Sequence, residues 1–123
     1  DWTQAKGQEL VQSLLEQQAD FNVIYSENDN MAYGAIDALR NAGLTPGQDV
    51  TLLSFDAANA ALHLILTGEI SLDVECNPLH GPRVRAIIEQ LQAGETPAKF
   101  TYVEETAFEA DGLTEEIIAG RGY

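Results

Sequence analysis

The chain has 123 residues, a length typical of one domain, and its 20 acidic and 6 basic residues give a formal net charge of −14. This charge argues against a surface that binds nucleic-acid phosphates or docks on an anionic membrane, because both need a basic footprint. Hydrophobic residues make up 45% of the chain, enough to build a core, and the single cysteine excludes an internal disulfide and any cysteine-based zinc cluster.

The chain begins at Asp1-Trp2-Thr3, which is neither a start methionine nor an export signal. We therefore expect a processed product or a fragment of a longer protein. Helical spacing of apolar residues predicts a first helix over residues 5–18, and a short β-rich run predicts a strand over residues 21–26. Asn28-Asp29-Asn30 then suits the start of a second helix, which carries one apolar face and stops near Gly43.

The middle of the chain predicts a strand, a helix and a second strand. Residues 50–55 are almost continuously apolar, which is typical of a strand buried on both faces. A helix follows over residues 57–67. Residues 70–76 alternate between an apolar face and a polar face. The apolar face carries Ile70, Leu72, Val74 and Cys76, and the polar face carries Ser71, Asp73 and Glu75.

The last part of the chain predicts a helix that starts at Pro82 and ends at Gly94, then a strand over residues 100–106 and a short helix over residues 113–119. The Pro82 helix carries an apolar stripe of Val84, Ile87, Ile88 and Leu91. Helices and strands alternate throughout, which predicts right-handed βαβ units. The predicted fold class is α/β, a three-layer α/β/α arrangement with a mainly parallel, Rossmann-like sheet.

Polar side chains follow three of the predicted strands, at the edge where open α/β sheets bind ligands. They are Asn28 and Asp29, then Asp56, then Glu75, Cys76 and Asn77. Carboxylates accept hydrogen bonds from neighbouring hydroxyls and amides both donate and accept, so this set suits a hydroxyl-rich ligand. Structural roles are the alternative: helix caps for the first three, a solvated strand residue for Glu75, a small core residue for Cys76 and a packing plug for Trp2.

The sequence offers little that indicates an enzyme. His63 and His80 are isolated and lack the spacing of a metal-binding pair, and Ser54 lacks the G-x-S-x-G context of a nucleophile. No glycine-rich nucleotide motif occurs in the chain. We therefore predict no catalytic residue, no metal site and no cofactor.

The run from Asn28 to Gly43 resembles the N-D-x-M-A-x-G-A-x-x-A-L-x-x-A-G signature of type I periplasmic sugar-binding proteins. The strand end Ser54-Phe55-Asp56 is similar to the G-F-D of that family, and the run from Val74 to Pro78 is similar to a strand that crosses between its two lobes. The resemblance extends from Trp2 to about Phe108, and residues 75–82 resemble the galactofuranose-binding members.

This resemblance implies a non-enzymatic, periplasmic sugar-binding component of an ABC importer. Its two Rossmann-like lobes would close on a monosaccharide, a pentose or hexose in pyranose or furanose form, and pass it to an ATP-driven permease in the membrane. The ligand-binding residues would be Trp2, stacked on the sugar ring, Asn28 and Asp56, bonded to hydroxyls, and Cys76 with Asn77 on the crossing strand. Cys76 stands where many relatives have an amide side chain that contacts the sugar. In this chain that sugar contact would pass to Glu75 or Asn77, or the ligand does not need it.

The resemblance also divides the chain. Residues 1–76 would belong to the second (C-terminal) lobe, residues 77–103 to the first (N-terminal) lobe, and residues 104–123 would return to the second lobe. The apolar stripe of the Pro82 helix would then lack its natural sheet. We expect the chain to self-associate, to exchange elements with a second copy or to sit against a separate first-lobe segment, and to bind sugar weakly by itself.

Two other interpretations stay open. The effector-binding domain of a LacI-type transcription regulator shares this fold and related motifs, and a helix-turn-helix before the present sequence would identify it. An α/β enzyme fragment is the third interpretation, and the lack of a recognisable nucleophile, base or metal set disfavours it.

Overall fold

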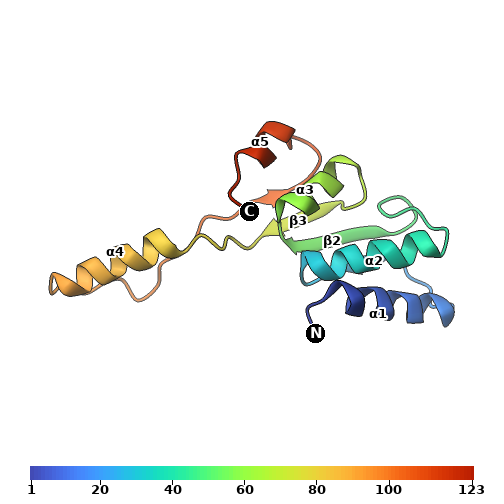
Figure 1. Cartoon of the computed structure of the whole chain (residues 1–123), viewed down its shortest axis with the longest axis horizontal. Coiled ribbons are helices and arrows are strands. Elements are labelled where there is room, and N and C mark those ends of the chain that lie inside the picture. Colours follow the sequence, from blue (N-terminus) through green and yellow to red (C-terminus); the bar gives the residue numbers. More distant parts are fainter.

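The computed structural model describes all residues from Asp1 to Tyr123 and shows an α/β body from which one helix projects (Figure 1). Helices and strands alternate in the predicted order, which confirms the α/β fold class. The elements are α1 Gln4–Glu16, β1 Val23–Tyr25, α2 Asp29–Asn41, β2 Thr51–Asp56, α3 Asn59–Leu66, β3 Leu72–Glu75, α4 Gly81–Gln92, β4 Ala107–Phe108 and α5 Glu115–Ala119. None of the helices has the length and hydropathy needed to cross a membrane.

The sheet has the strand order β1-β2-β3-β4, with parallel pairing among the first three strands and antiparallel pairing between β3 and β4. The prediction of a strand over residues 100–106 is wrong, since these residues form no regular element and β4 begins only at Ala107. The sequence there is β-rich, but only Thr106 at its end bonds to β3, and Tyr102 is 86% exposed. Without a neighbouring strand no ladder forms.

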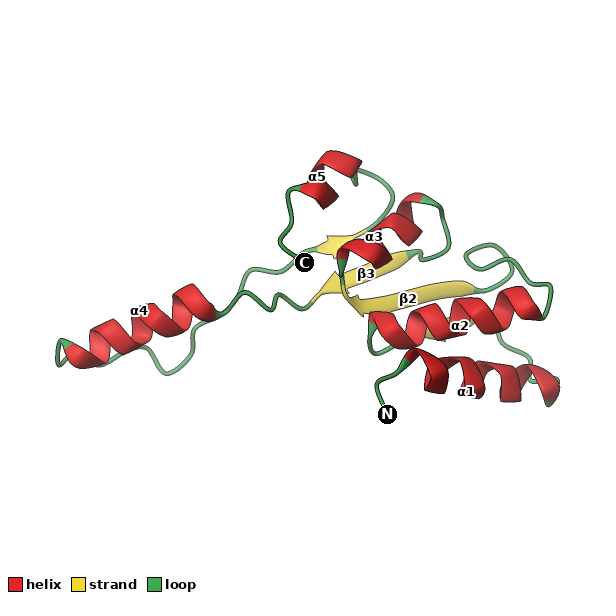
Figure 2. Ribbon diagram, in the orientation of Figure 1, coloured by secondary structure: helices red, strands yellow, loops and turns green.

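The hydrophobic core lies between one face of the sheet and the helices α2 and α3, which run alongside the strands that they connect (Figure 2). Both connections are right-handed crossovers in the same direction along the sheet, so both helices cover the same face. The fully buried side chains include Leu39, Leu52, Leu62 and Ile65. Two of the three layers expected for this fold class are therefore present in the chain.

Helix α1 packs directly against α2, and two glycines permit the close approach. A Cβ atom on Gly7 would lie 2.4 Å from the carbonyl oxygen of Met31, and one on Gly34 would lie 2.0 Å from the carbonyl oxygen of Gln4. Both distances are far below van der Waals contact, so any larger residue would force the helices apart. The contact also places the first turns of α1 and α2 side by side.

The opposite face of the sheet carries apolar side chains that no helix of this chain covers. The prediction that residues 50–55 are buried on both faces is therefore wrong: Leu52 and Ser54 are buried, whereas Leu53 and Phe55 are half-buried. Tyr25 packs edge-on against Phe55, with the ring centroids 5.4 Å apart, and is still 61% exposed.

The two faces of β3 are reversed relative to the prediction. Asp73 and Glu75 are buried, Leu72 and Val74 are half-buried, and Cys76 is exposed. The polar face of the strand points toward the helix side, where backbone N–H groups and an arginine need acceptors. The interpretations of Glu75 as a solvated residue and of Cys76 as a core residue are both corrected by this arrangement.

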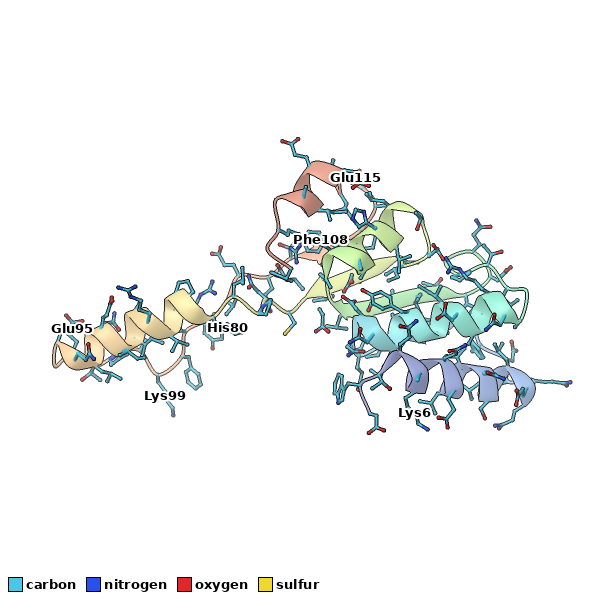
Figure 3. The ribbon with its side chains drawn as sticks, viewed as in Figure 1. Lys6, His80, Glu95, Lys99, Phe108 and Glu115 are labelled. Carbon is cyan, nitrogen blue, oxygen red and sulfur yellow. The ribbon has the colours of Figure 1, made fainter.

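Helix α4 projects from the body on two extended segments, and we call residues 77–103 the α4 arm. Figure 3 labels His80, Glu95 and Lys99 along this arm, beyond the end of the body that carries Lys6. The helix has no buried residue, and its apolar stripe leaves Val84, Ile88 and Leu91 about half exposed. The arm therefore contributes nothing to the core of the body.

Candidate functional site

The carboxyl ends of β1, β2 and β3 meet at one edge of the sheet, because these strands are parallel neighbours. Asn28 follows β1, Asp56 ends β2, and Cys76 with Asn77 follows β3. Trp2 precedes α1, whose first turn lies beside that of α2. The structure thus brings the five predicted binding residues to the same end of the body, from which the α4 arm leaves (Figure 1).

Asn28 is buried at the start of α2, where its Oδ1 accepts a hydrogen bond of 2.9 Å from the backbone N–H of Met31. This is an N-cap, so the structural role expected for the residue is present. The capping bond uses the side-chain oxygen only. The amide nitrogen has no acceptor within the protein and can donate to a ligand at the edge of the sheet.

Asp56 ends β2 in a backbone conformation that is rare for residues other than glycine. Its φ is +111°, and that of the following Ala57 is +55°. Burial, and then the negative charge of Asp29, raise the pKa of the half-buried Asp56 carboxyl, while the backbone N–H of Asp29 opposes them. Strained residues of this kind persist only where the surrounding structure holds them, and they concentrate at functional sites.

Three side chains from distant parts of the chain hold this turn. The backbone N–H of Ala57 donates to Asp73 Oδ1 at 3.1 Å, and that of Ala58 donates to Asp29 Oδ2 at 2.8 Å. Arg121 Nη2 donates to the carbonyl oxygen of Ala57 at 2.8 Å. The roles of Asp73 and Arg121 were not predicted. One signal could have pointed to them: α3 begins after Ala58, which has no side-chain oxygen, so its first N–H groups need acceptors from elsewhere.

A third buried acid, Glu75, lies next to the turn. It forms with Arg121 and Tyr123 a group that we call the C-terminal clasp. Arg121 Nη1 donates to Glu75 Oε1 at 2.9 Å, the Tyr123 hydroxyl donates to the same oxygen, and the Thr106 N–H donates to Oε2 at 3.0 Å. The Arg121 guanidinium also lies over the ring of Phe108, 4.8 Å from its centroid.

Glu75 is held in its charged form by these contacts. Burial favours the neutral acid, but the hydrogen bonds from Tyr123, Arg121 and the backbone outweigh it and lower the pKa of Glu75. Both carboxylate oxygens are occupied within the protein. Because these bonds engage Glu75 within the fold, the contact expected at Cys76 is left to Asn77 or is not needed by the ligand.

The remaining predicted residues are accessible. Trp2 is 62% exposed, so it is not a packing plug, and the thiol of Cys76 is exposed as well. Asn77 Oδ1 accepts from the N–H of Leu79 at 2.8 Å, and the Asn77 N–H donates to Glu105 at 2.9 Å. The amide nitrogen of Asn77 has no partner in the chain.

The edge of the sheet is an open surface in this chain. A largely apolar pocket of about 280 Å³ lies between α1, β1 and α2, and none of the five predicted binding residues lines it or any other pocket. No group of three His, Cys, Asp or Glu side chains is arranged to hold a metal ion. The five predicted binding residues can donate and accept hydrogen bonds, and Trp2 offers a flat aromatic surface. These are properties suited to binding a polar ligand.

Comparisons with known proteins agree with the fold. A family model described as "Periplasmic binding protein domain" matches residues 1–78. The galactofuranose-binding protein YtfQ of Escherichia coli (strain K12) is 31% identical over 121 residues, which are 95% of this chain and 38% of that protein. A crystal structure from Mycobacterium smegmatis in complex with β-D-fucofuranose is 29% identical with a TM-score of 0.84, and the match covers 90% of this chain and 36% of that one.

The chain thus spans well under half the length of these relatives. A transcription regulator is also similar over a shorter stretch: the HTH-type transcriptional regulator AscG of Escherichia coli (strain K12) is 42% identical over 55 residues, 45% of this chain and 16% of that protein. The relatives with long matches are named for sugar binding.

Proposed function

The chain belongs to the periplasmic binding protein domain family, and from this premise we propose that it is part of the sugar-binding component of an ABC importer. In this role it binds a monosaccharide in the periplasm without changing it chemically. The loaded protein then passes the sugar to a permease in the membrane.

One observation carries this proposal: Asn28 and Asp56 lie at the carboxyl ends of neighbouring parallel strands, at one edge of the sheet. The free amide nitrogen of Asn28 can donate to a hydroxyl oxygen, and the Asp56 carboxylate can accept from hydroxyl groups. A hydrogen bond to a charged group contributes about 1.5–3 kcal/mol where water is excluded. Two such side chains at one edge suit a ligand with several hydroxyl groups.

We assign Trp2, Cys76 and Asn77 to the margin of the same site. The exposed indole of Trp2 offers a flat apolar surface, and the C–H face of a sugar ring gains dispersion and area burial against such a surface. Asn77 keeps a free amide nitrogen, whereas the Cys76 thiol can only donate weakly. We therefore propose that Asn77 makes the polar contact on this strand.

A sugar in its furanose form is the preferred ligand. A relative that is 31% identical and matches 95% of this chain is named for galactofuranose, and the similar structure from Mycobacterium smegmatis holds β-D-fucofuranose. A five-membered ring is therefore the first choice for binding experiments, with pyranose forms as the comparison.

We further propose that the α4 arm, residues 77–103, belongs to the first (N-terminal) lobe, and that residues 1–76 and 104–123, the body, belong to the second (C-terminal) lobe. The exposed apolar stripe of α4 would then pack on the rest of the first lobe. Half a cleft supplies half of the contacts, so the 123-residue chain alone should bind sugar weakly and should self-associate or take up a separate first-lobe segment.

A second candidate is the effector-binding domain of a transcription regulator, and the similarity to AscG favours it. That similarity covers 45% of this chain, whereas the similarity to YtfQ covers 95%. The longer match includes the α4 arm and favours the importer. A DNA-binding domain ahead of the present sequence in the full-length protein would decide for the regulator.

The test is calorimetric titration of the full-length protein with furanose and pyranose sugars. We expect binding of a furanose sugar, and we expect Asp56→Ala to weaken it at least tenfold because a charge-assisted bond is lost. Asp20→Ala, which removes an exposed carboxylate on the loop before β1, is the matched control and should bind as the wild type does. Unchanged binding by Asp56→Ala would remove that residue from the site, and a folded protein that binds no sugar would refute the function.

A further inference from the structure

Two buried aspartates, Asp29 of α2 and Asp73 of β3, lie together beneath the turn that carries Asp56. Asp29 is 3% exposed and Asp73 is completely buried. Three of the four carboxyl oxygens have donors: Asp29 Oδ1 accepts from the Ser54 hydroxyl at 2.7 Å, and the other two accept from the backbone N–H groups of the turn. The fourth oxygen, Asp73 Oδ2, is buried without a partner. A buried carboxylate with an unpaired oxygen is costly.

A proton on Asp73 removes this cost. Protonated Oδ2 can donate to the Asp29 carboxylate, so that every oxygen of the pair is satisfied. Burial first, and then the hydrogen bond to Asp29 and its negative charge, raise the pKa of Asp73 to about 8, while the hydrogen bond from the Ala57 N–H opposes them. The pKa of Asp73 is raised because two neighbouring acids cannot both ionise easily.

The groups around the pair are acidic or neutral apart from Arg121, whose guanidinium is bonded to Glu75 and to the carbonyl oxygen of Ala57. Asp56 at the end of β2 adds a negative charge to the pair. Tyr33, one turn after Asp29 on α2, lies close enough that burial and the neighbouring aspartates raise its own pKa above the ordinary value. Glu75, the next residue on the same face of β3, is occupied by Arg121 and Tyr123. A proton is therefore the means of neutralising the pair.

The pair bears directly on the strained turn. Asp73 holds the N–H of Ala57, the second of the two residues with positive φ, and Asp29 holds that of Ala58, which follows them. If Asp73 loses its proton, two buried negative charges repel each other at the point where both N–H groups are held. The turn can relax by moving one carboxylate toward water, and Asp56 would move with it.

We propose that Asp73 is a positioning residue for the sugar site: protonated and bonded to Asp29, it holds the Asp56–Ala57 turn in the geometry that binds ligand, and loss of the proton weakens binding. The inference rests on the proposed function for the role of Asp56. The acid pair itself does not depend on that function, so the two can be tested apart.

The first test measures the stability of the chain by urea unfolding from pH 4 to pH 9. Because the folded pKa of Asp73 lies above its ordinary value of 3.8, this group stabilises the fold at low pH, and its contribution falls as pH rises toward about 8. In Asp73→Asn the amide accepts from Ala57 and donates to Asp29 with no proton to lose. We expect the unfolding constant of the wild type to rise at least tenfold more than that of Asp73→Asn between pH 5 and pH 8.

Asp20→Asn removes the same charge from an exposed site and should keep the wild-type slope. Parallel pH profiles for Asp73→Asn and Asp20→Asn would overturn the acid pair. Carboxyl ¹³C NMR of the wild type gives a check that needs no variant: Asp73 should titrate well above the exposed acids, and titration among them would refute the proposal.

The second test measures sugar affinity of the full-length protein from pH 5 to pH 9. We expect the dissociation constant of the wild type to rise about tenfold across this range and that of Asp73→Asn to stay level. The dissociation constant of Asp73→Leu should be at least tenfold higher than that of the wild type at every pH, since the buried N–H of Ala57 is left unpaired. Equal pH profiles for the wild type and Asp73→Asn would overturn the positioning role. No binding by any form would refute the proposed function, and the stability comparison would still decide the acid pair.

Discussion

Helices α2 and α4 have nearly the same length and a similar spacing of apolar residues, yet their surroundings are opposite. Helix α2, of 13 residues, buries residues along most of its length against α1 and the sheet. Helix α4, of 12 residues, buries none and exposes its stripe on the α4 arm. The difference teaches that an amphipathic pattern specifies which face of a helix needs a partner and leaves open which element supplies that partner.

The helix caps and the ion pairs also differ between the two regions: those of the body are bonded or buried, and those of the arm are unbonded or exposed. The N-cap of α2 is Asn28, whose side chain binds the helix, whereas the N-cap of α4 is His80, which makes no such bond. The Arg121–Glu75 pair is almost buried, whereas the Arg85–Glu89 pair of α4 is largely exposed. Each difference provides an experiment that can break or sharpen the comparison.

The largest expected difference comes from truncating one leucine in each region. Leu39 of α2 is completely buried, so Leu39→Ala should lower the free energy of unfolding by about 2–5 kcal/mol. Leu91 of α4 is 58% exposed, so Leu91→Ala should change it by about 0.5 kcal/mol or less. Urea unfolding of this chain at low concentration measures both. A loss of stability for Leu91→Ala that grows with protein concentration would indicate that the arm associates with a second copy. Equal losses of stability for the two variants at low concentration would contradict the contrast between α2 and α4.

The next difference comes from the two ion pairs. Arg121→Ala should destabilise the chain by about 3 kcal/mol, because it leaves the charge of Glu75 buried without its positively charged partner. Arg85→Ala should cost about 0.5 kcal/mol or less, as exposed helical pairs usually do. The folded pKa of Glu75 lies below its ordinary value of 4.5, so the stabilising effect is present above that pH and is lost as pH falls through the lowered value. A loss that does not shrink as the pH falls would show that Arg121 acts through its packing and its bond to Ala57 and not through the charge of Glu75.

The smallest expected effects concern the helix caps. Asn28→Ala should lower global stability by about 1 kcal/mol, because the Met31 N–H loses its acceptor. His80→Asn adds a capping side chain to α4 and should slow amide hydrogen exchange within α4 a few-fold. It should leave the unfolding of the body unchanged, since α4 packs on no part of it. A change in the global unfolding midpoint with His80→Asn would show that arm and body unfold as one unit.

Local signals predicted much of the fold. The order of the elements, the cap at Asn28 and the turn after α2 at Gly43 all follow from short stretches of sequence, and the structure confirms them. The edge at which Asn28 and Asp56 meet also follows, because it depends only on parallel strands joined by helices. The predicted strand over residues 100–106 failed because a β-rich segment needs a neighbour to pair with, and the neighbour depends on where the α4 arm turns back.

The roles of individual polar residues depended on contacts between distant parts of the chain. The alternation in β3 was visible in the sequence, but its direction was not: whether Asp73 or Val74 faces the helices is decided by which side α2 and α3 cover. Arg121 comes 46 positions after Glu75 in the chain, and no local pattern joins them.

By itself, the sequence determined the α/β class and the residues that stand at the carboxyl ends of the strands, because periodicity and capping are properties of neighbouring residues. The tertiary structure decided that the pKa values of two acids on one strand shift in opposite directions. Asp73 lies against another carboxyl group and is stabilised by a proton, whereas Glu75 lies against an arginine and is stabilised as the anion. That difference arises from which groups surround each side chain once the chain has folded, since burial and nearby charge set a pKa.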